Sequence, residues 1–212
     1  GSVTGATSGL TIGGSNTETG EITLAGGGIT ATAGDALHIV GSNAGLIENG
    51  IGGRIGSATG NGIVVEKDNA ATGRILSQNR ISAVAGNGIE IGGSNAGGIA
   101  SSGTIAATTG ILVTGTNAGL IENNGGSIGT ASTNVVTGIQ VVTANTGVID
   151  NYAAGKIYSS GDAILVGGSE TTANNSGLVA NRSTITAGGA GIHVTGDNAG
   201  TLSTWAADHP LT

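Results

Sequence analysis

The chain has 212 residues, of which 44 are glycine and 1% are aromatic, so Ile, Val, Leu and Ala must supply the core. A formal net charge of −7 with six Lys and Arg argues against a surface for nucleic acid or anionic membranes. Glycine at this frequency without a G-X-Y triplet excludes collagen, and the ordered recurrence of Ile and Val argues against disorder. The composition predicts many short strands joined by sharp turns, where Gly, Asn and Asp tolerate positive φ.

The first predicted element, after a lead-in over residues 1–8, is a short strand that recurs along the whole chain. The lead-in begins with Gly1-Ser2, which is typical of residues left by tag removal. The recurring strand approximates Gly-Ile-x-Val, and successive copies begin 22 to 28 residues apart, which is the signature of a repeat architecture. The copies are Leu10–Ile12, Leu37–Ile39, Ile63–Val65, Ile89–Ile91, Ile111–Val113, Ile139–Val141, Ile164–Val166 and Ile192–Val194.

An asparagine turn follows the first strand and leads into a second strand. The turn is clearest as GSNAG at residues 41–45 and 93–97. Its asparagines are Asn16, Asn43, Asn69, Asn95, Asn117, Asn145 and Asn198. The second strand carries one aliphatic residue at a fixed place: Ile22, Ile47, Ile75, Ile99, Ile121, Ile149, Val179 and Leu202. Two residues later the chain often has Asn or Ser, at Asn49, Ser77, Ser101, Asn123, Asn151 and Asn181.

A third short strand completes each unit and adds a further core position. Its aliphatic residues are Ile29, Ile55, Ile81, Ile105, Ile128, Ile157 and Ile185. Asn-Gly pairs such as Asn61-Gly62 favour hairpins, but hairpins would leave the few apolar residues of each strand without a covering layer. Stacked coils instead place Ile on Ile and Asn on Asn along one axis.

The repeat therefore predicts an all-β fold, a single-stranded parallel β-helix with three short strands per coil and about eight coils. We expect the β-helix to be right-handed, because connections between parallel strands are almost always right-handed. The β-helix is predicted over residues 9–203. Residues 204–212 form an irregular C-terminal tail or cap, since no third-strand Ile follows Leu202 and Pro210 removes a ladder donor.

Two units carry a resemblance to a known family. GILVTGTNAGLIENNGGSI at Gly110–Ile128 and GIHVTGDNAGTLS at Gly191–Ser203 resemble passenger repeats of bacterial autotransporter (type V secreted) proteins, in particular adhesin-like passengers with pectin-lyase-type β-helices. The resemblance implies a virulence-associated rod at the bacterial cell surface or secreted, reached through the periplasm and outer membrane. It also implies a parent protein anchored by a C-terminal outer-membrane β-barrel, with a host-cell or matrix receptor, or self-association, as the partner.

Apparent catalytic motifs fall on positions of the coil. Residues 125–129 match G-x-S-x-G around Ser127. Asp150 or Asp162, followed by His193, would complete the Ser–Asp–His chain order of an α/β-hydrolase triad. That elbow requires a strand followed by a helix, whereas Ile128 is a third-strand core position. His38 and His193 lie about six coils apart, too far to share a metal. We therefore predict no catalytic, cofactor-binding or metal-binding residue and no enzymatic activity.

A carbohydrate-active, pectin-lyase-like enzyme is the alternative function, with its site outside this segment or in a carboxylate row. The row is Glu48, Glu122 and Asp150 on the outer side of the second strand, and the last two come from successive coils. Paired carboxylates can serve acid/base chemistry or hold a cation. The simpler interpretation is a solvated face, partly balanced by the third-strand basic residues Arg54, Arg80 and Lys156.

The outward middle position of the first strand supplies the candidate interaction face. Its row is Thr11, His38, Val64, Glu90, Leu112, Gln140, Leu165 and His193. Val64, Leu112 and Leu165 are apolar residues predicted to point outward, and we expect them to contribute to contacts with a neighbouring rod or an added domain. The predicted function is a structural or adhesive rod that mediates cell adhesion or self-association.

Overall fold

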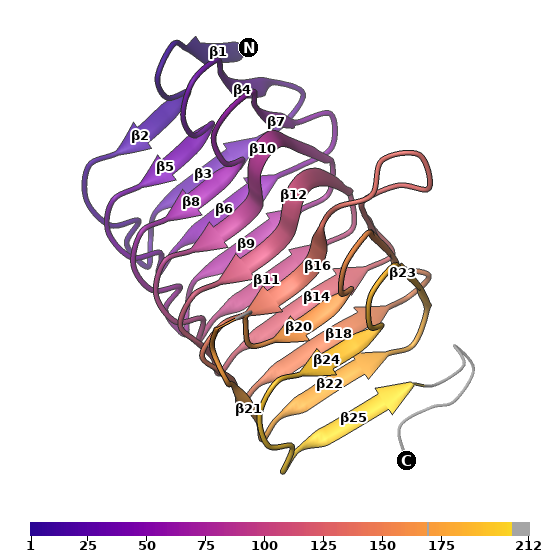
Figure 1. Cartoon of the computed structure of the whole chain (residues 1–212). Coiled ribbons are helices and arrows are strands. Elements are labelled where there is room, and N and C mark those ends of the chain that lie inside the picture. The colour runs from indigo at the N-terminus through magenta and orange to yellow at the C-terminus, as the bar shows by residue number, and fades with distance from the viewer. Residues whose placement is uncertain (169, 205–212) are drawn as a thin grey trace.

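The computed structural model describes residues 1–168 and 170–204, and the regular structure of this part of the chain is entirely β-strand. Short strands stack parallel into a β-solenoid of about eight coils with three strands per coil, as the repeat predicted. The first and last strands, β1 and β25, lie at opposite ends of the stack (Figure 1).

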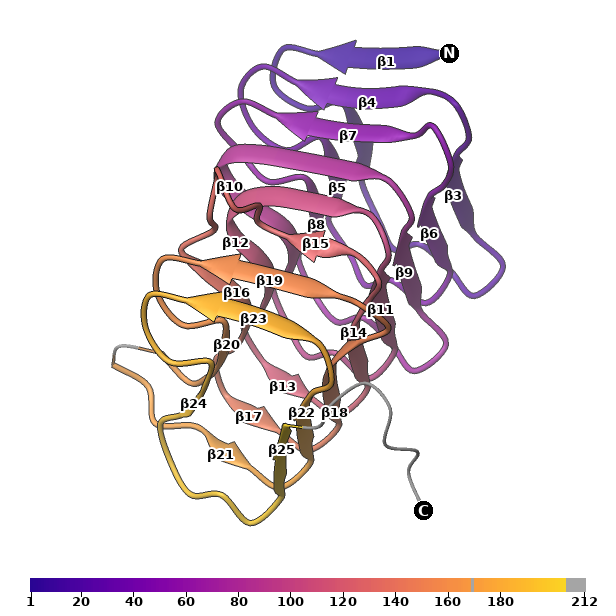
Figure 2. The same cartoon turned by 90° about the vertical axis from the view of Figure 1, so that its right-hand side faces the viewer.

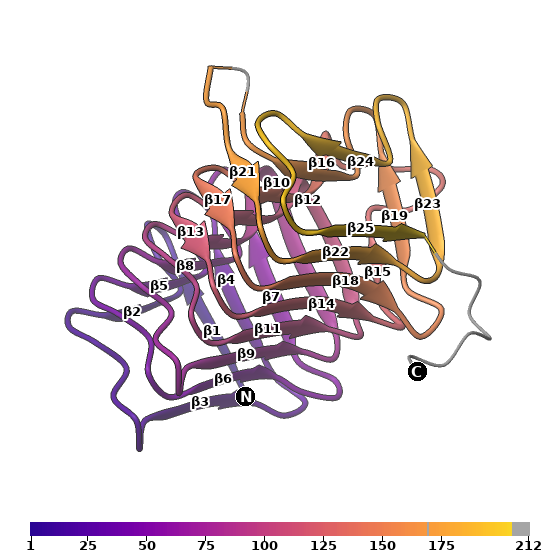
Figure 3. The ribbon, with the colours of Figure 1, turned by 90° about the horizontal axis from the view of Figure 1, so that it is seen from below.

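Three faces run along the solenoid, named here after the strand of the repeat that builds them. The first-strand face holds β2 (Leu10–Ile12), β5 (Leu37–Ile39), β8 (Ile63–Val65), β16 (Thr137–Val141), β20 (Ile164–Val166) and β24 (Ile192–Val194). The second-strand face, in order along the axis in Figure 3, holds β3 (Glu21–Leu24), β6 (Leu46–Asn49), β9 (Arg74–Ser77), β11 (Gly98–Ser101), β14 (Leu120–Asn124), β18 (Val148–Tyr152), β22 (Leu178–Asn181) and β25 (Thr201–Thr204).

The third-strand face is the one turned toward the viewer at the top of Figure 2. It holds β1 (Ser2–Gly5), β4 (Gly28–Ala31), β7 (Arg54–Ser57), β10 (Arg80–Ile91), β12 (Thr104–Val113), β15 (Ser127–Ile128), β19 (Lys156–Ser159) and β23 (Thr184–Ala187). Strands β10 and β12 continue round the corner into the first-strand face, so the two faces form one 14-stranded sheet. Three short strands, β13 (Thr116–Asn117), β17 (Ala144–Asn145) and β21 (Asn174–Asn175), pair at the asparagine corner.

The solenoid begins earlier than the sequence predicted. Strand β1 pairs parallel with β4, residue for residue from Ser2↔Gly28 to Gly5↔Ala31, so it belongs to the third-strand face rather than to a lead-in before the β-helix. The prediction for residues 1–8 was wrong because Val3 stands where later coils have Ile, and a single partial coil shows no period. At the other end Thr204 closes β25, and residues 205–212 lie outside the described residues.

Aliphatic columns fill the interior in the predicted register. On the second-strand face Ile47, Ile75, Ile99, Ile121 and Ile149 are paired from coil to coil and have no exposed surface. The third-strand residues Ile81, Ile105, Ile128 and Ile157 behave in the same way. Each β-branched side chain covers the one before it, so the core is a set of columns rather than a cluster of aromatics.

A ladder of asparagine amides lines one corner of this interior. The Nδ2 of each member donates to the Oδ1 of the member in the next coil at 2.7–2.8 Å. The members are Asn16, Asn43, Asn69, Asn95, Asn117, Asn145, Asn175 and Asn198. Asn175 was not among the asparagines predicted from the sequence, because the corner before it is longer than in other coils. Asn175 nevertheless keeps the Asn-x-Gly pattern of Asn117 and Asn145.

Candidate functional site

The predicted row on the first-strand face exists as one line along the axis. Its eight members, from Thr11 to His193, are direct partners in the parallel registers of successive strands. Val64, however, is 7% exposed, so the prediction that it projects into solvent was wrong. The valine lies in register between His38 and Glu90, whose longer side chains flank it. Leu112 and Leu165 are half-buried and separated by Gln140.

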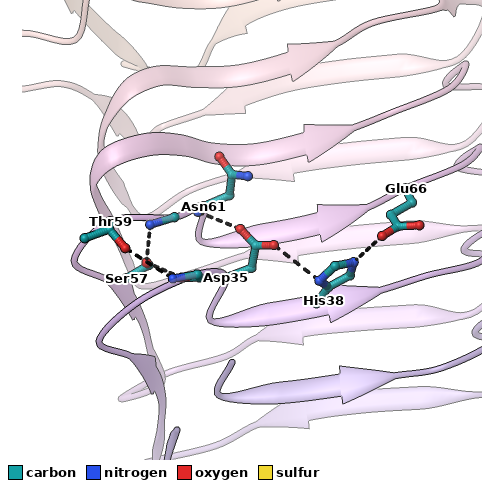
Figure 4. Close-up of polar contacts among 8 residues, drawn as sticks. Asp35, His38, Ser57, Thr59, Asn61 and Glu66 are labelled. Carbon is teal, nitrogen blue, oxygen red and sulfur yellow. Dashed lines mark hydrogen bonds and ion pairs between the residues drawn. The ribbon is translucent and has the colours of Figure 1, made fainter. Parts of the chain in front are cut away.

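His38 is held between two carboxylates on this face (Figure 4). Its Nδ1 lies 3.3 Å from Oδ2 of Asp35, and its Nε2 lies 2.7 Å from Oε1 of Glu66 in the next coil. The other oxygen of Asp35 accepts the backbone N–H of Asn61 at 2.8 Å. The three side chains therefore join one coil to the next at this corner.

The serine nearest this cluster in Figure 4 is engaged in the corner itself. Ser57 Oγ donates to the carbonyl of Gly34 and accepts the N–H of Gly60 at 2.8 Å. Its hydroxyl hydrogen is thus directed at a backbone carbonyl rather than at the His38 ring. The arrangement binds coils together and does not present an activated nucleophile.

His193 has a carboxylate partner of its own. Its Nδ1 lies 2.7 Å from Oδ2 of Asp162, whose Oδ1 accepts the backbone N–H of Ala190 at 2.7 Å. Six coil steps of about 4.8 Å place it about 29 Å from His38. Within residues 1–168 and 170–204, no three His, Cys, Asp or Glu side chains gather where they could hold a metal ion.

The G-x-S-x-G segment is a corner of the coil. Ser127 Oγ donates to the carbonyl of Gly129 at 2.6 Å, and Gly129 has a φ of +73°. Ile128 between them is completely buried in the third-strand column. The described part of the chain has no helix after this segment, so the serine lacks the strained strand-to-helix turn of a hydrolase elbow.

The carboxylate row contains one buried member. Glu122 and Asp150 are register partners on β14 and β18, whereas Leu76 and Ala100 occupy the intervening coils between Glu48 and Glu122. Asp150 is 6% exposed, so its interpretation as part of a solvated face was wrong.

Arg182, on the corner after β22, is the cation that balances Asp150. One guanidinium nitrogen lies 2.9 Å from Oδ2 of Asp150, and the guanidinium carbon lies 5.3 Å from the centre of the Tyr152 ring. Oδ1 of Asp150 is buried and has no hydrogen-bond partner. Burial raises the pKa of Asp150, Arg182 opposes that shift, and the nearby charge of Glu122 adds to it.

The basic residues predicted to balance this row lie on another face. Arg54 pairs in register with Arg80 on the third-strand face, and Lys156 pairs there with Ser127. Within the described residues, no carboxylate lies within 4.0 Å of Arg80 or Lys156. Alternation along a strand predicts which way a side chain points, but the short corner that carries Arg182 lies outside the strand pattern.

A notch that the repeat pattern did not predict lies at the corner between the second-strand and third-strand faces. Two residues join Ser77 to Arg80 and two join Ser101 to Thr104, whereas four join Asn151 to Lys156. A polar depression of about 570 Å³, here called the corner notch, lies over these corners and over the three-residue corner between Asn123 and Ser127. Its lining residues are Gln78, Asn79, Arg80, Ser102, Gly103, Thr104, Gly125, Gly126, Ser127, Ala154 and Lys156. Corner length was the signal that could have revealed it.

Comparisons with protein families, with curated proteins and with solved structures gave no match to this chain. Among the described residues there is also no helix with the length and apolar character needed to cross a membrane.

Proposed function

We propose that this chain is part of a surface-exposed autotransporter passenger, in which the solenoid acts as an adhesive rod. The rod would stand at the bacterial cell surface or be secreted, and would mediate attachment to a host-cell or matrix receptor or self-association. The passenger-like units around Gly110 and Gly191 suggest this family, and the stacked coils are the architecture that the resemblance implies.

The observation that carries the proposal is the unbroken asparagine ladder. Seven successive amide hydrogen bonds connect the eight coils, and the members from Asn43 to Asn175 have no exposed surface. Buried amides that bond to one another along the axis lock each coil onto its neighbours. A rod locked in this way can hold a binding surface away from its anchor.

Attachment of protein-coated beads tests the adhesive function. Beads coated with the chain should bind cultured epithelial cells or immobilised matrix proteins more than albumin-coated beads do. If the coated beads attach no better than the albumin control and the chain also stays monomeric in light scattering, the adhesive function is wrong.

Self-association has its own test on the first-strand face. Replacing both Leu112 and Leu165 with Lys places charges in the predicted interaction face, at the two apolar positions that reach solvent. We expect light scattering to show weaker association, because lysine must lose hydration in a tight contact. Association at the wild-type level would remove this face from the proposal.

Asp150 supports a second candidate, a carbohydrate-active β-helix enzyme. Its raised pKa, its unpaired buried Oδ1 and the neighbouring Glu122 are features of acid/base carboxylates. A depolymerisation assay on acidic and neutral polysaccharides separates the candidates. Turnover by the wild-type chain that Glu122→Gln and Asp150→Asn each abolish would favour the enzyme.

A further inference from the structure

Four side chains in the lining of the corner notch have unused hydrogen-bonding capacity. Within the described residues, the hydroxyls of Ser102 and Thr104 and the charged groups of Arg80 and Lys156 form no hydrogen bond or ion pair. Arg80, Ser102 and Lys156 are exposed. The notch therefore offers both hydroxyl groups and positive charge to solvent.

The two cations stand at opposite ends of the notch. Arg80 immediately precedes the Ile81↔Ile105 pair, Thr104 pairs with Ser127, and Ser127 pairs with Lys156. Arg80 and Lys156 are thus three coils apart in one row, which corresponds to about 14 Å along the axis. The hydroxyl residues Thr104 and Ser127 occupy the two coils between them.

Acidic residues near the notch are engaged by amides and leave these cations unneutralised. Glu48 accepts from Nε2 of Gln78 at 3.0 Å, and Glu122 accepts from Nδ2 of Asn124 at 3.4 Å. The chain has a net charge of −7, but the two cations without an ion pair give this depression a locally positive charge. A local positive charge favours an anionic ligand.

The corner beside the notch also carries backbone strain. Ala153 and Ala154 have φ angles of 49° and 65°, the left-handed region that favours glycine. Ala154 lines the notch, and its corner is the long one that bounds it. Strain of this kind concentrates at binding and catalytic sites.

We infer that the corner notch binds an acidic oligosaccharide, with Arg80 and Lys156 contacting anionic groups at its two ends and the hydroxyls of Ser102 and Thr104 contacting the sugar ring between them. The inference rests on the adhesive function proposed for the rod and gives its ligand a chemical class.

An acidic peptide fits the notch less well. The backbone N–H groups of Ser102, Ser127 and Lys156 all donate to carbonyls of the preceding coil at 2.8 Å, so no strand edge is open there to an added peptide. Among the described lining residues Ala154 carries the only wholly apolar side chain, which gives apolar peptide residues little to pack against. A hydroxyl-rich chain with fixed anionic groups matches the lining.

Calorimetry with defined probes tests the inference on the full chain. The probes are a tetrasaccharide of galacturonate, a heparin tetrasaccharide, a neutral maltotetraose and a polyglutamate peptide. The variant Arg80→Gln/Lys156→Gln removes both cations from the notch. Lys67→Gln/Arg74→Gln is the matched control, since it removes one exposed Lys and one exposed Arg outside the notch and changes the net charge equally.

We expect the wild-type chain and the control to bind an acidic tetrasaccharide and neither to bind maltotetraose. The notch variant should bind the acidic tetrasaccharide at least about tenfold more weakly than the wild type. Preference for the galacturonate or the heparin probe identifies carboxylate or sulfate as the anionic group. No binding of either acidic probe, or equal losses in both double variants, overturns the inference, and polyglutamate binding as tightly as the sugars assigns the notch to a peptide instead.

The bead assay keeps the two proposals separate. Attachment of wild-type beads to cells without binding of acidic tetrasaccharides refutes the notch inference alone. Binding of the tetrasaccharides by a chain that neither attaches the beads nor self-associates in light scattering refutes the adhesive function alone.

Discussion

Asn117 closes two buried hydrogen bonds of the ladder. It accepts from Nδ2 of Asn95 at 2.7 Å and donates to Oδ1 of Asn145 at 2.8 Å. Asn117→Leu keeps a side chain of similar size, but it leaves Nδ2 of Asn95 and Oδ1 of Asn145 without their ladder hydrogen bonds. We expect a loss of about 2–5 kcal/mol in the free energy of unfolding, measured by urea denaturation. Asn134→Ala, at an exposed asparagine, is the control and should have little effect; a loss as large as that of Asn117→Leu would contradict the role of the ladder.

Ser101 interrupts the second column of polar residues, which sits at the corner next to the notch. Asn123 donates to Asn151, and Asn151 to Asn181, each at 2.8 Å. Ser101 is too short to continue this line, so its Oγ and Oδ1 of Asn123 are buried without partners. Ser101→Asn supplies a donor for Asn123, at a two-residue corner like the one that follows Asn181.

Ser101→Asn should stabilise the chain by about 1 kcal/mol, because it satisfies a buried acceptor. Thermal denaturation followed by circular dichroism measures the change. Ser102→Asn, at the exposed neighbouring position, should leave stability unchanged. Destabilisation by Ser101→Asn would show that the short corner has no room for the amide.

Asp150 makes stability depend on pH in a definite direction. Burial raises its pKa in the folded chain above the ordinary 3.8, so its protonated form is favoured by folding. Its contribution is present in full below pH 3.8 and is lost as the pH rises through the raised folded pKa. The free energy of unfolding of the wild type minus that of Asp150→Asn should therefore be larger at pH 3 than at pH 7. The opposite trend would mean that Arg182 outweighs burial.

At the level of the strand and corner, Ala153 and Ala154 mark a strained connection. Equivalent corners place glycine in the left-handed region, at Gly52 with φ +77° and Gly125 with φ +78°. Ala153→Gly removes steric strain from the folded chain, which stabilises it by about 1–2 kcal/mol. The glycine also makes the unfolded chain more flexible, which destabilises the fold by about 0.4–1 kcal/mol. The net expectation is a gain of about 0.5–1 kcal/mol in urea denaturation.

Ala131→Gly provides the matched control for this corner. Ala131 lies in an exposed turn and is not among the described residues with positive φ. The glycine there should cost stability through the unfolded chain alone. Equal effects of the two substitutions would contradict strain at Ala153.

For the whole molecule, the sequence was sufficient to predict three strands per coil, parallel stacking and the aliphatic columns. It succeeded because every coil repeats the same requirement, so a weak signal at Ile47 is reinforced at Ile75, Ile99 and Ile121. The first strand β1 was missed because one partial coil has no period to detect.

The candidate sites were less predictable, because they depend on differences between neighbouring coils. The burial of Val64 follows from the longer side chains of His38 and Glu90 beside it, which alternation alone does not report. The Asp150–Arg182 pair joins a strand to a corner of the next coil. The corner notch arises from unequal corner lengths. A repeat pattern defined by the positions common to all coils does not include such differences.

The central claim is that the folded coil stack, and not a flexible chain, is the adhesive element. Attachment to epithelial cells should be compared for beads coated with the wild-type chain and with Asn95→Leu/Asn145→Leu, which breaks the ladder at two places. Circular dichroism reports the loss of folded coils in the variant. We predict that attachment falls in proportion to the folded fraction. Attachment that persists at the wild-type level in the unfolded variant would contradict the claim.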